Sequence, residues 1–416
     1  MRLGLGMTTN GATDASVRYC AEVRPNIMLW NDAAPDIIRR CKAASPETKH
    51  IGRVVWGDQR PSQRRAFINK TLDKARENRG LVDYWVLYNE GVSDGDSEST
   101  IRAFAQDEVD NAKALNAEGF GALLLGFSTG VIDDGKLMAA RAALDYCARV
   151  GPKMAAIHWH EYSPCYVGCF VKTADGRNQW PDGGQFTGPS TDAAVWKDPT
   201  LRGWTNLRYR DIRPMLVANG WGSVEGYVTE FGIDNTGKNP AMYQGWRPGL
   251  GRGWRDYKGT PWERIAGMGT WPEQAGWYCW QASHDAWIKG VVTFGFAGAA
   301  HGWGDFDDSE EPEYFERMIQ VQRALPFGVI GMTPAPAPQP PPVPVPVPQP
   351  PPPSSLAVEP RVQVLRGDGW LSVIRRCKPG TATNADVTKM RAANPDVTVL
   401  TAGQWLRSPF HKAVLL

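Results

Sequence analysis

The sequence predicts an α/β protein in which a (β/α)8 barrel is followed by a proline-rich linker and a small C-terminal α/β unit. Three observations support this fold class. Eight short apolar runs alternate with helical patterns over residues 1–332. Proline occupies 13 of the 20 positions from Pro334 to Pro353, within a linker predicted at 333–355. A separate strand–helix pattern fills residues 356–416.

The barrel is predicted from the number and spacing of its strands. Strands that alternate with helices form parallel sheets, and eight such repeats over this length are typical of a closed barrel. An open doubly wound sheet is the alternative, but Gly4-Leu-Gly6 is a poor match to the glycine-rich turn that usually follows its first strand. The predicted strands are Leu3–Met7, Asn26–Trp30, Ile51–Trp56, Tyr84–Tyr88, Gly121–Phe127, Met154–Trp159, Tyr227–Thr229 and Val291–Phe296. The clearest helical patterns are Ser62–Asn78, Ser99–Glu118 and Lys136–Val150.

The linker and the charge distribution separate the two predicted domains. A polyproline II tract of this length makes a semi-rigid spacer of roughly 60 Å; the alternative is a ligand for a proline-recognition domain. The chain has 46 Lys and Arg against 44 Asp and Glu. From Ser354 onward there are nine basic and four acidic residues, a net charge of +5, so the remainder carries −3. We therefore expect the C-terminal domain to be attracted to an anionic surface, and we expect no nucleic-acid partner.

Cysteine content and apolar runs place limits on the environment of the chain. Seven scattered cysteines do not form a disulfide framework. The longest apolar runs, such as Val291–Ala300, are too short to span a bilayer, so no membrane partner is expected. No signal peptide is visible, and we expect a protein that works outside the cell to leave by a route such as lysis.

Two of the predicted strands end in a glutamate. Tyr84-Trp-Val-Leu-Tyr-Asn89-Glu90 is the fourth strand, and Gly226-Tyr-Val-Thr-Glu230-Phe-Gly232 is the seventh. Catalytic groups in barrels come from the C-terminal ends of strands, so Glu90 and Glu230 are expected to face each other across the barrel mouth. A pair of carboxylates is the equipment that glycosidic bond cleavage requires. The alternative is that Asn-Glu is a dipeptide that ends a strand by chance.

These motifs resemble clan A of the glycoside hydrolases, retaining barrels with an Asn-Glu acid/base on strand four and a glutamate nucleophile on strand seven. Thr229-Glu230-Phe231-Gly232 is similar to the nucleophile motif of the cellulase-like members. The resemblance covers roughly residues 2–330. It implies that Glu230 is the nucleophile, that Glu90 is the acid/base, and that Asn89 binds the sugar 2-substituent. No cofactor is implied.

The sixth predicted strand carries a further group of polar residues. His158 and His160 share one face, and the resemblance implies that His160 or Tyr162 contacts the nucleophile and orients it. All three are candidate substrate-binding residues, although a core histidine is the slightly favoured interpretation of His158. Glu161 lies on the wrong strand for either carboxylate role. A zinc site of His158, His160, Cys165 and Cys169 and a calcium site in the acidic stretch 305–311 are weaker alternatives, so we expect no metal.

Tryptophan is abundant, with 16 of 18 residues before the linker. Aromatic faces stack on the apolar faces of sugar rings, and several tryptophans fall where loops of the barrel mouth are expected. Trp30, Trp56 and Trp303 are the predicted substrate-binding members, and Trp204, Trp246 and Trp254 fall in similar positions. By contrast, Trp277, Trp280 and Trp287 fit a packing role before the last strand.

The C-terminal domain has a strand–turn–helix pattern at Val362–Ile374, a second helix at Val387–Ala393 and a closing strand at Leu400–Leu406. This pattern resembles a LysM module, a βααβ unit, over about Arg361–Pro409. The resemblance implies binding of glycans that contain N-acetylglucosamine. The residues it implicates are Gly367, Asp368, Gly369, Asn394, Pro395, Asp396 and Val397. Gly369 stands where Thr is usual, and 377–385 is longer than the usual turn. The alternative is an unrelated small α/β unit.

Together the two domains predict a retaining glycoside hydrolase that cleaves N-acetylglucosamine-containing wall glycan, either peptidoglycan or chitin. We expect a monomer that acts at the bacterial cell wall and resembles a phage lysin, released by lysis or associated with a virion. Two alternatives remain open. One is a non-catalytic glycan-binding or virion structural protein built on a barrel, and the other is a β-glycanase that acts on plant-type polysaccharide.

Overall fold

The structure is a computed structural model, in which the chain divides into two compact units, Met1–Pro338 and Gln339–Leu416. It describes residues 1–7, 14–32, 34–55, 63–163, 167, 171–172, 198–203, 205–233, 271–296, 312–324, 361–363, 387 and 405–407.

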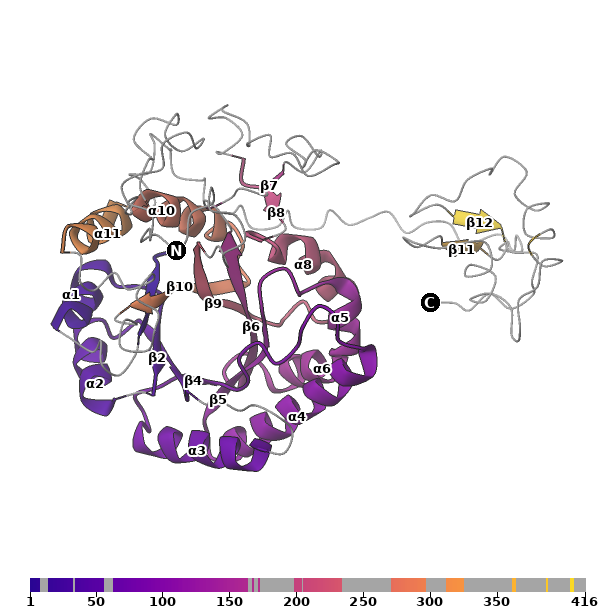
Figure 1. The fold of residues 1–416 in the computed structure, drawn as a ribbon, viewed down its shortest axis with the longest axis horizontal. Coiled ribbons are helices and arrows are strands. Elements are labelled where there is room, and N and C mark those ends of the chain that lie inside the picture. Colours follow the sequence, from indigo (N-terminus) through magenta and orange to yellow (C-terminus); the bar gives the residue numbers. More distant parts are fainter. Residues whose placement is uncertain are drawn as a thin grey trace, which may run out of the picture. The chain divides into compact units, whose positions relative to one another are not determined.

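The first unit is a closed barrel of eight parallel strands, shown in Figure 1. Each of the eight predicted strands has a counterpart in this barrel, which confirms the predicted (β/α)8 fold. In chain order the strands are β1 (Gly4–Met7), β2 (Ile27–Asn31), β3 (Lys49–Arg53), β4 (Tyr84–Val86), β5 (Gly121–Phe127), β6 (Ala155–Ser163), β9 (Gly226–Ile233) and β10 (Ile288–Phe296). The barrel closes where β1 pairs with both β2 and β10.

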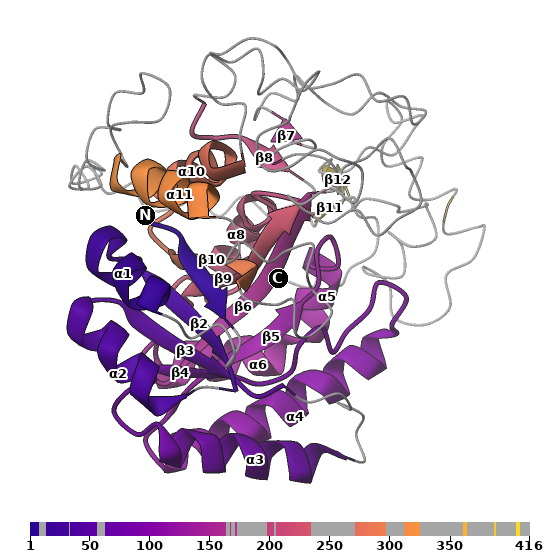
Figure 2. The ribbon, with the colours of Figure 1, turned by 60° about the vertical axis from the view of Figure 1, so that its left-hand side comes forward.

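Helices surround the strands (Figures 1 and 2). Helix α4 begins where the Ser97 hydroxyl accepts a hydrogen bond from the Thr100 N–H, which satisfies a donor of its first turn. The single helix predicted at Lys136–Val150 is instead two helices, because the backbone leaves the helical region at Ala140 (φ −86°, ψ 12°). The helices are α1 (Asp14–Val23), α2 (Pro35–Ala44), α3 (Arg64–Glu77), α4 (Glu98–Ala117), α5 (Asp134–Ala139), α6 (Arg141–Val150), α8 (Tyr209–Ala218), α10 (Trp271–Ala282) and α11 (Pro312–Ala324).

The apolar core has two parts because parallel barrel strands are buried on both faces. A small cluster fills the barrel interior and includes Leu29, Ile51 and Ala156. A larger cluster lies between the strands and the helices and includes Trp85 and Trp159. Side chains alternate along a strand. The inward positions that follow Leu29, Ile51 and Ala156 are therefore Asn31, Arg53, and His158 with His160.

Two short antiparallel pairs complete the described structure. Strands β7 (Val171–Lys172) and β8 (Arg202–Gly203) form one pair in the first unit. In the second unit, β11 (Arg361–Gln363) pairs with β12 (Trp405–Arg407), with Val362 opposite Leu406. A pairing of the first and last strands is what a βααβ unit requires, but the predicted glycan-binding positions Gly367–Gly369 and Asn394–Val397 lie outside the described residues. None of the helices in the described residues combines the length and apolar character needed to cross a bilayer.

Candidate active site

The predicted carboxylate pair lies at the C-terminal ends of the barrel strands. Glu230 belongs to β9, and its side chain is 6% exposed. Glu90 follows β4, and its side chain is 44% exposed. Glu90 adopts a left-handed backbone conformation (φ 50°), and its N–H donates to the Gly126 carbonyl at 2.8 Å. The buried carboxylate and the exposed one therefore face very different surroundings.

His160 bridges the two carboxylates from β6. Its Nδ1 lies 2.9 Å from Glu90 Oε1 and 3.4 Å from Glu230 Oε2. These two oxygens are therefore no farther apart than the sum of the two distances, about 6.3 Å. Retaining glycosidases hold their carboxyl groups ~5–5.5 Å apart, whereas inverting enzymes need ~6.5–9.5 Å to admit a water molecule. This limit applies to one oxygen pair and is compatible with the retaining separation.

The surroundings of Glu230 favour its ionised form. Burial acts to raise the pKa of Glu230, but His160, Arg53 and Tyr162 outweigh burial, and the pKa is lowered. Arg53 Nη1 forms an ion pair with Glu230 Oε1, and the Tyr162 hydroxyl donates to Oε2 at 2.7 Å. Burial and the charge of Glu230 raise the pKa of Tyr162 well above its ordinary value, so the phenol keeps the proton that it donates.

Arg53 also organises the rest of the mouth. Its Nη1 donates to Asn89 Oδ1 at 2.8 Å, and its Nε donates to Asn31 Oδ1 at 2.8 Å. The guanidinium therefore links the nucleophile position to the Asn89-Glu90 segment. Neither Arg53 nor Asn31 was predicted from the sequence. The available signal was their position, because each is the last residue of a barrel strand and lies on its inward face.

Two predicted substrate-binding residues need correction. Trp30 is 2% exposed, belongs to the layer between strands and helices, and donates its indole N–H to His50 Nδ1 at 2.9 Å. The prediction that it stacks on a sugar is wrong, because it points away from the barrel interior. His158 is 1% exposed and shares a 2.7 Å hydrogen bond with Thr229 Oγ1. Burial lowers the pKa of His158 well below its ordinary value, so it is a neutral residue beneath the site.

His160 and Tyr162 contact the carboxylates themselves. The His160 side chain has no exposed surface, so its described role is to hold Glu90 and Glu230 and not to bind substrate directly. The contact with the nucleophile that the resemblance implied for His160 or Tyr162 is made by both residues.

The remaining predicted site residues of the first unit lie outside the described residues. These are Trp56, Trp303, Cys165, Cys169 and the acidic stretch 305–311, together with Trp204, Trp246 and Trp254. In the part of the chain that the structure describes, no group of three or more His, Cys, Asp or Glu side chains is arranged to hold a metal ion. The described contacts of His158 and His160 are instead with Thr229 and the two glutamates.

Glu161 supports the site from outside the barrel. It is 1% exposed and accepts hydrogen bonds from the N–H groups of Leu207 (2.6 Å) and Arg208 (3.1 Å), where α8 begins. The Tyr278 hydroxyl of α10 also donates to it. Burial raises the pKa of Glu161 to about 7. Its described side-chain hydrogen bonds come from Trp159, Leu207, Arg208 and Tyr278.

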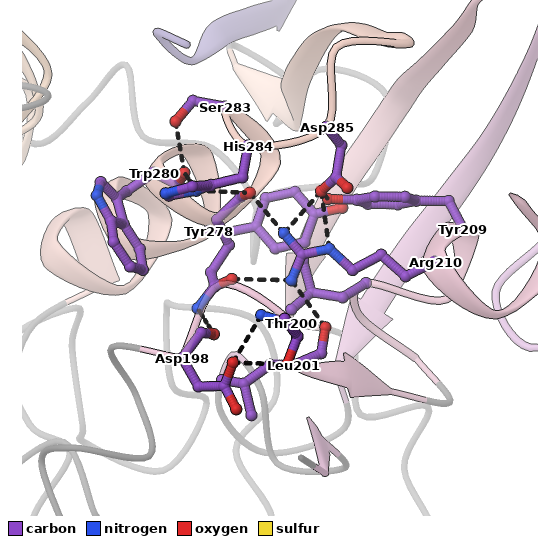
Figure 3. A network of polar contacts seen from close by, with 12 residues as sticks. Asp198, Thr200, Leu201, Tyr209, Arg210, Tyr278, Trp280, Ser283, His284 and Asp285 are labelled. Atoms are coloured by element: carbon purple, nitrogen blue, oxygen red, sulfur yellow. Dashed lines mark hydrogen bonds and ion pairs between the residues drawn. The ribbon is translucent and has the colours of Figure 1, made fainter. Parts of the chain in front are cut away.

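A polar network centred on Arg210 lies behind the same strands, and Figure 3 shows its members. Arg210 of α8 donates to Asp285 Oδ2 (2.7 Å), to the Leu201 carbonyl (2.7 Å) and to the Gln281 carbonyl (2.6 Å). The guanidinium therefore joins α8 to α10 and to the segment 198–203. These bonds fix the helices that pack behind β6 and β9, the strands that carry His160 and Glu230.

Comparison with known proteins gives only weak structural similarity. No protein-family model matches the chain, and no curated protein matches it. Xylanase 10B from Thermotoga petrophila RKU-1, solved with xylobiose, is 11% identical over 71% of this chain and 82% of that chain, with a TM-score of 0.36. A GH10 endoxylanase from a sugarcane soil metagenome is 15% identical over 77% and 97%, with a TM-score of 0.40. A family 51 α-L-arabinofuranosidase from Bifidobacterium longum is 12% identical over 69% and 60%, with a TM-score of 0.34. Similarity at this level transfers neither reaction nor substrate to this chain.

Proposed function

We propose that the chain is a retaining glycoside hydrolase. One observation carries this proposal: His160 bridges a buried glutamate, whose pKa is lowered, and an exposed glutamate, at a separation compatible with retention. The buried Glu230 suits the nucleophile, which must be ionised. The exposed Glu90 suits the group that exchanges protons with the leaving group and with water.

The reaction proceeds in two displacements. The Glu230 carboxylate attacks the anomeric carbon while the bond from that carbon to the leaving oxygen breaks, and Glu90 transfers its proton to that oxygen. Glu90, now ionised, takes a proton from a water molecule whose oxygen attacks the same carbon and releases Glu230. Each displacement inverts the centre, so the product retains the original configuration. Asn89, held by Arg53, is assigned to the sugar 2-substituent.

The substrate class follows from the C-terminal unit. Its sequence resembles a LysM module and carries a net charge of +5, which suits an anionic wall polymer. The proposed substrate is therefore N-acetylglucosamine-containing glycan, cleaved at the bacterial wall by a monomer that lysis releases or a virion carries. A β-glycanase that acts on plant-type polysaccharide is the second candidate, because a carboxylate pair serves the cleavage of glycosidic bonds in either kind of polymer.

Release of reducing ends tests the reaction and the substrate together. The full-length protein, Glu230→Gln and Glu225→Gln are incubated separately with peptidoglycan, chitin and xylan. Glu225 precedes the same strand at the opposite end of the barrel, where it pairs with Lys289 at 3.4 Å, so it is a matched control. We expect release by wild type and Glu225→Gln and background release by Glu230→Gln. Proton NMR of the first product is expected to show the anomer of the substrate.

Each outcome decides one element of the proposal. Equal release by wild type and Glu230→Gln contradicts the nucleophile assignment. Binding of glycan without release by any variant supports the non-catalytic alternative. An inverted first product contradicts the two-step mechanism, and release from xylan alone selects the plant-polysaccharide candidate.

A further inference from the structure

Glu108 carries a buried carboxyl group that the mechanism does not use. It lies on α4, and the residue has no exposed surface. Both of its oxygens accept main-chain hydrogen bonds: Oε1 from the Tyr88 N–H at 3.1 Å, and Oε2 from the Leu125 N–H. Burial raises the pKa of Glu108 to about 8. Burying a carboxyl group is unfavourable unless it accepts hydrogen bonds from buried donors that would otherwise have no partner.

The two donors flank the backbone that presents Glu90. Tyr88 is two residues before Glu90, just beyond the end of β4. Leu125 lies in β5 where the register with β6 shifts, and its φ of 63° is left-handed. The next residue, Gly126, accepts the Glu90 N–H at 2.8 Å. Glu108 therefore holds both sides of one short structure, the end of β4 and the irregular segment of β5.

This short structure depends on external support. Glu90 and Leu125 both have left-handed backbones without being glycine, a conformation that persists only where neighbouring groups enforce it. At Gly126 the strands are so close that a Cβ atom would lie 2.4 Å from the Tyr88 carbonyl oxygen and 2.7 Å from His158 Cε1. Small changes in the Tyr88 and Leu125 backbone therefore move the Glu90 carboxyl relative to Glu230 and His160.

We propose that Glu108 is a positioning residue that sets the location of the acid/base Glu90 by fixing the Tyr88 and Leu125 backbones from outside the barrel. This inference rests on the proposed function. Loss of Glu108 should impair steps in which Glu90 transfers a proton and spare the attack by Glu230. A residue that merely stabilises the fold would not separate these two effects.

The test compares two substrates, one whose leaving group needs a proton and one whose leaving group does not. In Glu108→Gln the amide oxygen accepts one of the two N–H groups, while the amide NH2 confronts the other, so one support is lost. Wild type and Glu108→Gln are compared on a 2,4-dinitrophenyl glycoside of the product sugar and on the unactivated oligosaccharide. Dinitrophenolate leaves without protonation, so its kcat/KM depends mainly on nucleophilic attack. We expect kcat/KM to fall about 10- to 100-fold on the oligosaccharide and less than about 3-fold on the dinitrophenyl glycoside.

Two further variants complete the test. One controls for the general effect of altering a buried glutamate, and the other serves if Glu108→Gln does not fold. Glu273→Gln alters another buried glutamate, 5% exposed, that pairs with Arg317 away from β4 and β5, and it should leave the ratio of the two kcat/KM values unchanged. Glu108→Asp keeps the carboxyl group but shortens its reach. If Glu108→Gln does not fold, Glu108→Asp should show the same pattern, a larger loss of kcat/KM on the oligosaccharide than on the dinitrophenyl glycoside. Equal losses on both substrates, or no loss on either, overturn the inference.

A measurement independent of catalysis separates this inference from the proposed function. Amide hydrogen exchange is followed in peptides covering 84–92 and 121–127. We expect faster exchange at Tyr88 and Leu125 in Glu108→Gln, with no change elsewhere in the barrel. If wild type cleaves no glycan and exchange nevertheless rises at these amides, the proposed function fails while the structural role of Glu108 holds. Unchanged exchange overturns that role regardless of activity.

Discussion

Glu230 is held ionised by groups that reach it from two separate strands of the barrel. Arg53 extends from the end of β3, while His160 and Tyr162 extend from β6. Burial alone would favour the neutral acid, so the lowered pKa depends on these three partners together. Removing one of these partners should therefore raise the pKa of Glu230 while the other two partners stay in place.

Tyr162→Phe tests this dependence. The change removes the 2.7 Å hydrogen bond to Glu230 Oε2 and keeps the ring. A hydrogen bond to a charged group contributes about 1.5–3 kcal/mol, which corresponds to roughly one to two pKa units. Glu230 must be ionised to attack, so activity is lost as pH falls through its pKa. A raised pKa therefore moves the acidic limb of the kcat/KM profile to higher pH by roughly one to two units.

The matched control for this shift is Tyr146→Phe. Tyr146 lies on α6, is 5% exposed and donates its hydroxyl to Asn116, outside the active site. Its acidic limb should coincide with that of wild type. An unchanged limb in Tyr162→Phe, or a shift to lower pH, would show that Tyr162 does not stabilise the ionised nucleophile.

Strand position predicted that the two carboxylates lie together but not which residues contact them. Glu90 and Glu230 were found because each ends a strand within a distinctive motif. Arg53 and Asn31 have the same strand-end placement but no motif, and their importance depends on contacts between strands that are distant in sequence. Trp30 was assigned wrongly because its parity along β2 was not considered. Leu29 and Asn31 point inward, so Trp30 points outward toward the helices.

At the scale of elements, the barrel strands were predictable because burial on both faces makes each strand an almost continuous apolar run. Strands β7 and β8 have two residues each and carry no periodicity that a sequence can reveal. The irregular register of β5 was equally hidden, since Leu125 is an ordinary apolar residue in the sequence. Its backbone is left-handed and its N–H donates to Glu108 of α4, a tertiary contact.

Packing between strands and helices gives a stability prediction at Gly52 of β3. A Cβ atom there would lie 2.6 Å from the Trp85 ring, and Trp85 has no exposed surface into which it can move. Gly52→Ala should therefore lower the free energy of unfolding by about 1–3 kcal/mol, measured by urea denaturation. The control is Gly95→Ala, because Gly95 has nothing within 4 Å of its Cβ position. Equal midpoints for the two variants would contradict this account of the packing.

At the scale of the whole molecule, the chain assigns its two predicted tasks to separate units. Glu90, Glu230, the residues that contact them and Glu108 all belong to Met1–Pro338. The excess positive charge belongs to the C-terminal unit, where nine basic residues oppose four acidic ones. Because the barrel closes through the pairing of β1 with β10, its fold requires no strand from the second unit. Catalysis and attachment to an insoluble polymer should therefore be separable.

Removing residues 339–416 tests this separation. The shortened chain keeps the closed barrel and every described site residue, so kcat/KM on a small soluble glycoside should remain within about 2-fold of the full-length value, which is under about 0.5 kcal/mol. Binding to insoluble peptidoglycan, measured by co-sedimentation, should be lost. In the full-length protein, binding should also weaken as salt rises from 0.05 to 0.5 M, because screening reduces the attraction of the basic unit to an anionic wall. Retained wall binding by the shortened chain would place the attachment surface on the barrel and remove the main support for a wall-glycan substrate.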